Sequence, residues 1–483
     1  MNYEVVMGLE VHVELATESK LFCSCSAKYG AGANENVCPA CMGMPGYPPV
    51  VNKKAIELGV RAGLLTNCRI AEFITFDKKN YYYPDLPAGY QITQLFHPIC
   101  TGGYLDIKVP EGDRRIRIKQ IHIEEDAGKL VHDSWSDSSL VDYNRTSVPL
   151  IEIVSMPDFR SAGEVTAYLE TLRRLLTFAG ISDCRMQEGS MRADINISVR
   201  EKGDDGLGTR TEMKNLNSLR AIARAIEYEA QRHIDALDTG FEKLVQETRR
   251  WDDSKNMSFS MRNKENATDY RYFPDSELMP VFIGGDWIEK IKSDIPESAD
   301  EKYARYMTEY ELPEQDCRIL TTSKGLADIF DETVKFCGMP KEAANWLLVE
   351  LMNLAKADGV NIDDARADGE KIAKLIIMVD KKVVSRATGK EIFAEIYRNG
   401  SDPEEYASRN KLGMVSDEGL LMEAAKAAID GNPKSVAEYK EGNDKIIGFL
   451  MGAVMKETSG KADPKAARDI LQKLMEEAAH RNK

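Results

Sequence analysis

Short stretches in which hydrophobic and polar residues alternate dominate the first 290 or so residues of the chain. Alternation with a period of two predicts β-strands with one buried face. The segments with this pattern are Val5–Leu15, Ile116–Glu125, Leu150–Val154, Ala193–Val199 and Gly208–Leu216. The hydrophobic phase of the second segment changes near Gln120, which predicts a β-bulge at that position.

Segments with the residue spacing of α-helices lie between these strands. Ser161 and Glu164 form a capping box ahead of regularly spaced leucines, and Gly180 predicts the end of that helix. From about residue 295 onward one helical pattern follows another, and Asp463–Pro464 predicts the start of the last helix. Strands and helices that mix without strict alternation favour the α+β class over a doubly wound parallel sheet.

Pro296 and Ser298 open a new helical pattern, and a second change lies near residue 406. We therefore expect three parts, 1–292, 293–406 and 407–483. Net charge supports a separate last part: from Ser408 there are 13 Lys+Arg against 12 Asp+Glu, which leaves 51 against 67 for the rest of the 64 and 79. A helix of this part carries Gly448 and Gly452, which predict either close helix packing or a face open to an RNA backbone.

Composition excludes several classes of protein. The 483 residues are 43% hydrophobic, but no run approaches 18 apolar residues, so we expect no membrane span. The first 15 residues have no basic region, so a signal peptide is not expected. Nine cysteines, an odd number in a long chain, favour a reducing compartment and hence the cytoplasm. The net charge of −15 excludes a general nucleic-acid coat, so any RNA contact must be local.

Four of the cysteines form two close pairs, Cys23–Ser24–Cys25 and Cys38–Pro39–Ala40–Cys41. Two such pairs joined by a short loop can place four thiolates in a tetrahedron, which predicts a closed, structural Zn²⁺ site. The alternative is a set of four reduced cysteines in a core.

Carboxylates on half-buried strands cost free energy unless they bind a partner. Glu10, Glu125, Glu152, Asp194 and Glu212 all lie on or beside aliphatic strand segments. Hard oxygen ligands suit Mg²⁺, and Mg²⁺ commonly accompanies phosphates. Basic residues interleave with these acids, namely Lys79, Lys129, Arg145, Arg192 and Lys214. The pattern is typical of Mg²⁺-bridged ATP, and equally of ordinary salt bridges on a solvated face.

His12 shares its strand face with Glu10 and Glu14, which supports a metal-binding or proton-transfer role as strongly as a structural one. The chain has neither a P-loop nor a dinucleotide-binding glycine motif. It also lacks a nucleophile elbow or an amidase-type serine stretch for glutamine hydrolysis. Any ATP must therefore bind on a sheet platform.

Several long strings together resemble one family, the GatB family of the tRNA-dependent amidotransferases that make Gln-tRNA(Gln) or Asn-tRNA(Asn) from mischarged precursors. The resemblance runs nearly end to end and is more specific than a short motif. The strings are Val6–Leu15, Phe76–Pro87, Gly89–Gln94, His122–Lys129, Asp142–Arg145, Pro149–Ser155, Lys214–Ser218 and Asp269–Pro274.

This resemblance implies a glutamine-synthetase-like cradle domain, a helical linker and a YqeY-like helical tail that contacts tRNA. It implies a carbon–nitrogen ligase that uses glutamine as amido donor. ATP would phosphorylate the side-chain carboxylate of Glu-tRNA(Gln) or Asp-tRNA(Asn), and ammonia would then displace phosphate. The ammonia would come through a channel from an amidase (A) subunit, in a heterotrimer that also holds a small (C) subunit. The cysteines match a zinc-bearing branch of the family.

Carried over by motif, the resemblance makes Glu10, His12 and Glu125 the Mg²⁺ and catalytic residues. It places the catalytic Lys79 either at the ammonia exit or at a phosphate clamp. The strand pattern adds cofactor-binding residues, namely Glu152, Arg192, Asp194, Glu212 and Lys214. Two other functions stay open: a non-catalytic zinc-containing RNA-binding scaffold, and a free-standing amide ligase for a small acid.

Overall fold

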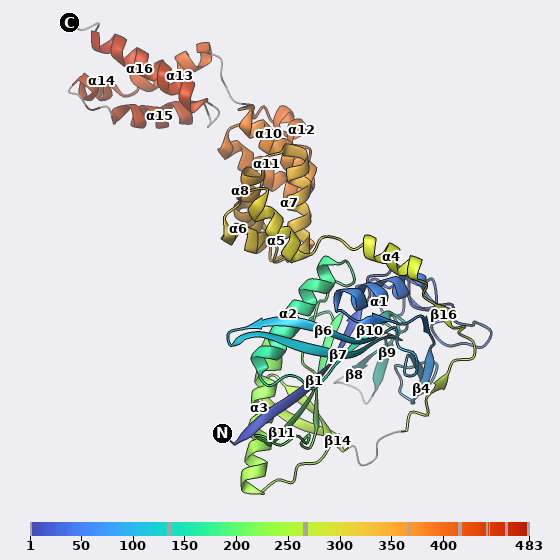
Figure 1. The fold of residues 1–483 in the computed structure, drawn as a ribbon. Helices are drawn as coiled ribbons and strands as arrows, with labels where there is room; N and C mark the ends of the chain where they lie inside the picture. The colour runs from blue at the N-terminus through green and yellow to red at the C-terminus, as the bar shows by residue number, and fades with distance from the viewer. Residues whose placement is uncertain are drawn as a thin grey trace. The chain divides into compact units, whose positions relative to one another are not determined.

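The computed structural model describes residues 2–132, 138–263, 269–365, 367–413, 418–440, 443, 445–458 and 462–480. The chain forms two compact units, Met1–Ser298 and Ala299–Lys483. The first unit mixes strands with helices, and the second is built from helices (Figure 1). The chain is therefore a mixed α+β protein, as the sequence predicts. No helix in the described part is long and apolar enough to cross a membrane.

A nine-stranded sheet forms the centre of the first unit, in the order β14-β13-β12-β11-β1-β10-β7-β6-β2. Neighbouring strands of this sheet run antiparallel except β12 and β13, which are parallel. Its strands are β1 (Tyr3–Glu14), β2 (Arg69–Ile70), β6 (Cys100–Val109), β7 (Gly112–Glu125), β10 (Pro149–Ser155), β11 (Met191–Glu201), β12 (Thr211–Lys214), β13 (Glu247–Asp252) and β14 (Met257–Asn263).

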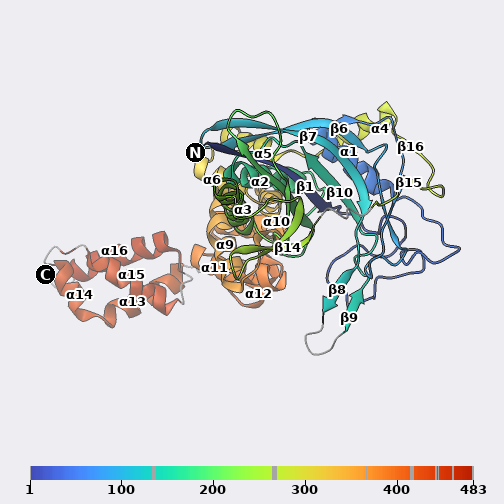
Figure 2. The same ribbon diagram turned by 90° about the horizontal axis from the view of Figure 1, so that it is seen from below.

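Smaller sheets flank the large one. β4 (Asp77–Asn80) pairs with both β5 (Tyr90–Thr93) and β15 (Phe273–Pro274), and β3 (Phe73–Ile74) pairs with β16 (Val281–Phe282). A further ribbon consists of β8 (Lys129–His132) and β9 (Ser139–Asp142). Figure 2 shows this ribbon standing off from the large sheet.

Helices of the first unit cover one face of the large sheet and leave the other face open. The helices are α1 (Lys53–Leu65), α2 (Ala162–Phe178), α3 (Leu219–Thr239) and α4 (Gly285–Ser293). Leu9, Val11 and Val13 of β1 point toward these helices and are buried in the core. Because side chains of a strand alternate between faces, Glu10 and His12 point to the opposite side. That polar face is where the candidate site lies.

Local sequence signals account for these elements. Ser161 Oγ accepts a hydrogen bond from Glu164 N (3.2 Å) at the start of α2, as the capping box predicts. Gly180 follows the helix with φ +67°, a conformation that glycine adopts without strain. The predicted bulge is confirmed, since β10 pairs with β7 through Val154–Gln120 and then Ser155–Ile118, which skips one residue of β7.

The second unit contains two separate hydrophobic clusters, one from Tyr306 to Ala407 and one from Leu421 to Met475. Its helices are α5 (Ala299–Thr308), α6 (Glu314–Leu320), α7 (Lys324–Cys337), α8 (Pro340–Asn345), the π-helix η2 (Trp346–Leu351), α9 (Met352–Asp358), the 3₁₀-helix η3 (Ile362–Asp364), α10 (Gly369–Asp380), α11 (Arg386–Asn399), α12 (Pro403–Arg409), α13 (Glu418–Asp430), α14 (Pro433–Lys440), α15 (Ile446–Glu457) and α16 (Pro464–His480). The boundaries expected at residues 292 and 406 stay predictions.

Two expectations for the last helices have different outcomes. Asp463 caps α16 as predicted, because its Oδ1 accepts hydrogen bonds from Lys465 N (2.8 Å) and Ala466 N (3.0 Å). Gly448 and Gly452 of α15 are exposed, and a Cβ added at either would meet no atom within 4 Å. Close packing among the described residues therefore does not explain these glycines, and a face open to an RNA backbone stays a prediction.

Candidate functional site

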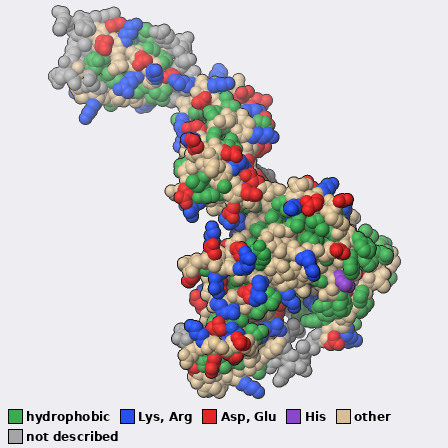
Figure 3. All heavy atoms as spheres, in the orientation of Figure 1, with side chains coloured by type: hydrophobic (Ala, Val, Ile, Leu, Met, Phe, Trp, Pro, Cys, Tyr) green, Lys and Arg blue, Asp and Glu red, His purple; other side chains and the backbone are tan. Residues whose placement is uncertain are grey.

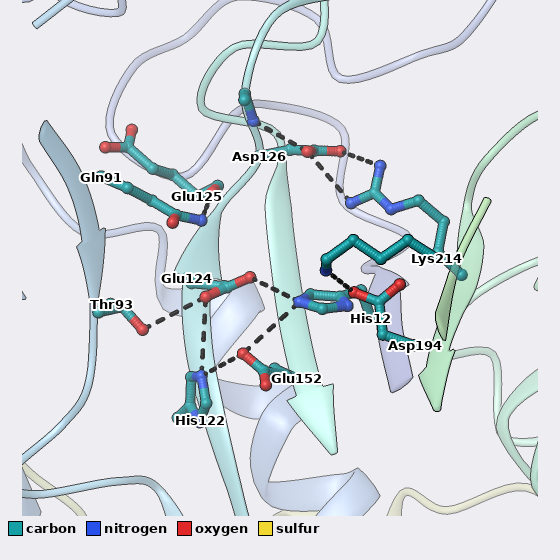
Figure 4. A network of polar contacts seen from close by, with 12 residues as sticks. His12, Gln91, Thr93, His122, Glu124, Glu125, Asp126, Glu152, Asp194 and Lys214 are labelled. Carbon is teal, nitrogen blue, oxygen red and sulfur yellow. Dashed lines mark hydrogen bonds and ion pairs between the residues drawn. The ribbon is translucent and has the colours of Figure 1, made fainter. Parts of the chain in front are cut away.

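A row of charged side chains crosses three central strands on the open face of the sheet. His12 of β1 pairs in register with Glu152 of β10, which pairs with His122 of β7. Glu152 Oε2 lies 2.9 Å from His122 Nε2 and 3.5 Å from His12 Nε2. Glu124 closes the group, since its Oε1 lies 3.4 Å from His12 Nε2 and its Oε2 accepts from Thr93 Oγ1 at 3.3 Å. Figure 4 shows all five side chains converging.

The histidines and glutamates of this row compensate one another's charges although their side chains are largely buried. Burial opposes ionisation of Glu152, but His122 and His12 outweigh it and hold the pKa of this carboxyl well below its usual range. Burial likewise disfavours the His122 cation, yet Glu152 and Glu124 raise its pKa to about 10. The pKa of His12 is raised by Glu152 in the same way, against its own burial. The row thus holds the ionised carboxylate of Glu152 away from bulk water.

A second acidic group lies on the same face toward β12. Glu10 pairs in register with Asp194 of β11, and Glu212 follows on β12. Asn196 Nδ2 donates to Glu10 Oε1 at 3.0 Å. Lys214 contacts Asp194, and its Nζ lies 3.1 Å from Glu212 Oε1. The structure therefore brings together four of the residues that the sequence assigns to cofactor and metal binding.

Both groups have the donors and the spacing that a divalent cation needs. The candidate ligand atoms of Glu10, Asp194 and Glu212 lie within 4.8 Å of one another, and so do those of His12, Glu124 and Glu152. Octahedral Mg²⁺ with bonds of about 2.1 Å separates its ligand atoms by roughly 3–4 Å, so small side-chain rotations suffice. Burial, followed by the charge of Glu152, raises the pKa of Glu10, and a cation would offset this repulsion.

Glu125 lies apart from the residues with which the sequence grouped it. Its carboxylate accepts from Ile92 N (2.9 Å) and from Ser147 Oγ, on the side of β7 opposite to Glu124 (Figure 4). Burial raises the pKa of Glu125 to about 7, despite these two hydrogen bonds. Of these two neighbouring glutamates it is Glu124 that contacts His12, so the catalytic role of Glu125 stays a prediction.

Lys79 enters from β4, on the small sheet beside the open face. Its Nζ lies 5.1 Å from the ring centroid of Tyr270 and 5.6 Å from that of Tyr81. Burial disfavours the ammonium, but the negative charge of Glu124 outweighs it and raises the pKa of Lys79. A cation held by aromatic rings near carboxylates suits either the ammonia exit or the phosphate clamp.

A cavity of about 960 Å³ opens beside the second acidic group, of which Asp194 lines it. Arg192 contacts Asp126 through two hydrogen bonds of 3.0 and 3.1 Å, and Arg145 Nε lies 3.2 Å from Asp126 Oδ2. Both arginines line the cavity, together with Asp194 and Lys129. A cavity of this volume accommodates a nucleotide-sized ligand, and both carboxylates and cations line it.

The four cysteines predicted to bind metal come together. The Sγ atoms of Cys23, Cys25, Cys38 and Cys41 lie within 4.8 Å of one another. Tetrahedral zinc with Zn–S bonds of about 2.3 Å needs sulfurs roughly 3.8 Å apart, so the set fits this ion. The thiol of Cys23, as a hydrogen-bond partner, lowers the pKa of Cys41 to about 5, aided by Cys38 and Lys20. Thiolate is the form that binds metal.

Sequence reasoning missed His122, Glu124 and Asp126. A signal for Glu124 was present, because after the bulge Ile121, Ile123 and Glu125 share one face of β7 and the even-numbered residues share the other. Asp126 follows the strand and carries no periodic signal.

Comparison with known proteins finds a matching family and full-length relatives for nearly the whole chain. Residues 5–289 match the family model described as the GatB/GatE catalytic domain, and residues 328–475 match the model described as the GatB domain. A relative from Agathobacter rectalis is 52% identical over 474 residues, which cover 98% of this chain and all of the relative. Relatives from Caldicellulosiruptor bescii (51% over 479 residues) and Thermodesulfovibrio yellowstonii (48% over 477 residues) each cover 99% of this chain and all of the relative. All three are named as the B-type subunit of an aspartyl/glutamyl-tRNA(Asn/Gln) amidotransferase, and this chain belongs to that family, the GatB family.

Proposed function

We propose that this chain converts mischarged Glu-tRNA(Gln), Asp-tRNA(Asn) or both into the amidated form, as the subunit that activates the side-chain carboxylate. A carboxylate oxygen attacks the γ-phosphorus of ATP, and ADP leaves. Ammonia then attacks the carbonyl carbon of the acyl phosphate, phosphate leaves and one proton is lost. The observation that carries this proposal is the convergence of two carboxylate groups on one face of the sheet, next to a cavity that Asp194, Arg145 and Arg192 line.

Each group of residues has a role in this proposal. Glu10, Asp194 and Glu212 would hold Mg²⁺, which supplies positive charge to the phosphates. His12, Glu124 and Glu152 would together hold a divalent cation at the other group. The cationic side chains would neutralise the moving phosphoryl group and orient it; they are Lys79, Arg192 and Lys214. The side chains on this face of the sheet are largely buried, and they would limit the access of water to the activated acyl group.

Glu125 keeps a proposed catalytic role of a different kind. A carboxyl whose pKa is about 7 accepts and releases protons readily near neutral pH. Glu125 would therefore take the proton that ammonia loses as the amide forms. Its carboxylate accepts from Ile92 N and lies on the side of β7 away from His12.

The remaining parts follow the family expectation. Residues 1–292 would be the cradle domain of the glutamine-synthetase-like kind, residues 293–406 the helical linker and residues 407–483 the YqeY-like tail that contacts tRNA. The protein would act in the cytoplasm.

An exposed apolar patch supports the proposal of partner subunits, an amidase and a small subunit. Phe73, Phe96, Met279 and Phe282 expose 39%, 51%, 78% and 76% of their surface, and the rings of Phe73 and Phe282 lie 6.2 Å apart. Figure 3 shows hydrophobic side chains gathered over the part of the first unit that carries β16. Apolar patches of this kind commonly mark protein–protein contacts.

Amidation of each mischarged tRNA tests the function directly. The full chain, with partner subunits, should form amide from glutamine or from ammonium, in both cases with ATP hydrolysis. Product formed without ATP, or none from either tRNA, would contradict the proposal. Turnover of free glutamate or aspartate would favour the free-standing amide ligase instead.

The cysteine cluster predicts bound zinc. Protein purified without chelator should contain about one equivalent of zinc, because four thiolates form a closed tetrahedral site. Cys25→Ser should lower that content at least tenfold, whereas serine at the buried Cys317, which lies in the helical unit, should leave it unchanged. Metal content is measured by mass spectrometry. Less than half an equivalent in the wild type would count against the site.

Removal of the tail tests its proposed contact with tRNA. A chain that ends at Gly413 keeps α12, whose Ala407 packs in the preceding hydrophobic cluster, and lacks the cluster from Leu421 to Met475. We expect its affinity for tRNA to fall at least tenfold, measured by filter binding, while partner assembly is kept. An unchanged affinity would refute the role of the tail.

A further inference from the structure

The loop between the two cysteine pairs forms one wall of the cavity beside the acidic groups. Residues 27–31 of this loop line the cavity, and Tyr29 in it is 75% exposed. Arg145 and Arg192 line the same cavity. The loop that the cysteine cluster closes therefore borders the cavity.

Lys20 connects the cysteine cluster to the rest of the site. Its side chain is wholly buried, at 0% exposed. Lys20 Nζ donates to the backbone oxygens of Asn36 (2.7 Å) and Tyr143 (3.3 Å), and it lies 3.7 Å from Cys41 Sγ. A buried ammonium costs several kcal/mol unless negative charge lies beside it. Carbonyl oxygens supply dipoles, whereas four thiolates around one divalent ion carry a net negative charge.

The contacts continue from Lys20 into the cavity wall. Asn144, the next residue after Tyr143, donates to Gly32 O (2.7 Å) and accepts from Asn36 N (2.9 Å), which fastens the loop to the segment 143–145. Arg145 then reaches Asp126, to which Arg192 is also bonded. A continuous path of contacts thus runs from Cys41 to both arginines of the cavity.

We propose that Lys20 is a positioning residue that ties the metal-loaded cysteine cluster to the cavity wall, so that the cavity binds Mg²⁺-nucleotide tightly only when the cluster is loaded. The proposal rests on the proposed function in one respect, the binding of Mg²⁺·ATP in this cavity. Lys20 itself contacts no ligand there. Without its ammonium, the segment 143–145 and the loop between the cysteine pairs, which Lys20 holds at Asn36, lose their common anchor, and Arg145 loses its fixed position.

Lys20→Met tests this tie in the full chain, because methionine keeps most of the stem and removes the charge. The matched control is Lys302→Met, since Lys302 is also buried (8% exposed) and ion-paired with Asp331, but lies in the helical unit. Dissociation constants for a Mg²⁺-bound, non-hydrolysable ATP analogue are measured by calorimetry, together with zinc content. We expect K20M to weaken binding at least tenfold with zinc retained, and K302M to change it less than twofold.

A second variant covers the case in which K20M loses its zinc. Asn34 of the loop between the cysteine pairs has φ +60°. Its Nδ2 donates to Val141 O (3.0 Å), and its Oδ1 accepts from Tyr143 N (2.8 Å), which fastens the loop to residues 141–143. Asn34→Gly suits that backbone conformation, removes both side-chain contacts and leaves the four cysteines in place. We expect zinc to stay and nucleotide binding to weaken severalfold.

Hydrogen exchange separates failure of this inference from failure of the proposed function. Amides of residues 27–31 and 143–145 should exchange faster in K20M than in the wild type or in K302M. Unchanged exchange, or unchanged nucleotide affinity in both K20M and N34G, would overturn the tie. A wild type that binds no nucleotide would refute the proposed function, and the exchange measurement would still decide whether Lys20 anchors these two segments.

Discussion

Asp194→Asn is expected to slow ATP-dependent amidation by about 10²–10³-fold and to raise the Mg²⁺ concentration for half-maximal rate at least tenfold. Asp194 lies in the middle of the acidic group, next to Glu10 and Glu212, and it also contacts Lys214. Asparagine keeps the shape but removes one of the three anionic ligands. A cation held by the remaining two would bind more weakly.

The measurement is the amidation rate at saturating tRNA over a range of Mg²⁺ concentrations. Asp106→Asn is the matched control, because Asp106 is an exposed residue of the same sheet that is paired with Arg115 and lies outside the site. This control should keep the wild-type Mg²⁺ dependence. If D194N behaved like the control, the acidic group would not be the metal site.

Glu124→Gln and Glu125→Gln should each lower amide formation by about 100-fold, but at different steps. E124Q removes the carboxylate next to His12 and His122, so the phosphorylation of the substrate carboxylate should fail. E125Q keeps the acceptor for Ile92 N but loses the proton acceptor whose pKa is about 7. Activation should therefore survive in E125Q, and attack by ammonia should fail.

The two steps are separated by supplying ATP and mischarged tRNA without any ammonia source. E125Q should then release phosphate from ATP at close to the wild-type rate, whereas E124Q should not. Both variants should bind tRNA within severalfold of the wild type. Wild-type amidation by E125Q would remove Glu125 from the catalytic machinery, and normal phosphate release by E124Q would remove Glu124 from the activation step.

The strands and their faces could be predicted because a period of two is a local property. The pattern over Val5–Leu15 placed Glu10 and His12 on the polar side of β1, and the structure has them there. Capping residues such as Ser161 and Asp463 act within three residues of their own position, so they too are readable from sequence. The cysteine pairs were predicted because their spacing is itself the signal.

The partners across strands could not be predicted with the same certainty. Whether Glu124 or Glu125 faces His12 depends on a one-residue bulge, and such a shift moves every later side chain to the other face. The partners of Lys20 come from residues 36, 41 and 143, which only the folded chain brings together. Asp126 is held by Arg192, 66 positions later in the sequence.

The position of β1 in the sheet has a consequence for synthesis. This strand is made before both of its neighbours, β10 and β11, which begin after residue 148. At 5–20 residues per second, the ribosome needs roughly 7–30 seconds to deliver the first neighbour. During that interval the apolar side of the nascent strand has no sheet to join, so this enzyme should depend on chaperones that shield its N-terminal segment on the ribosome.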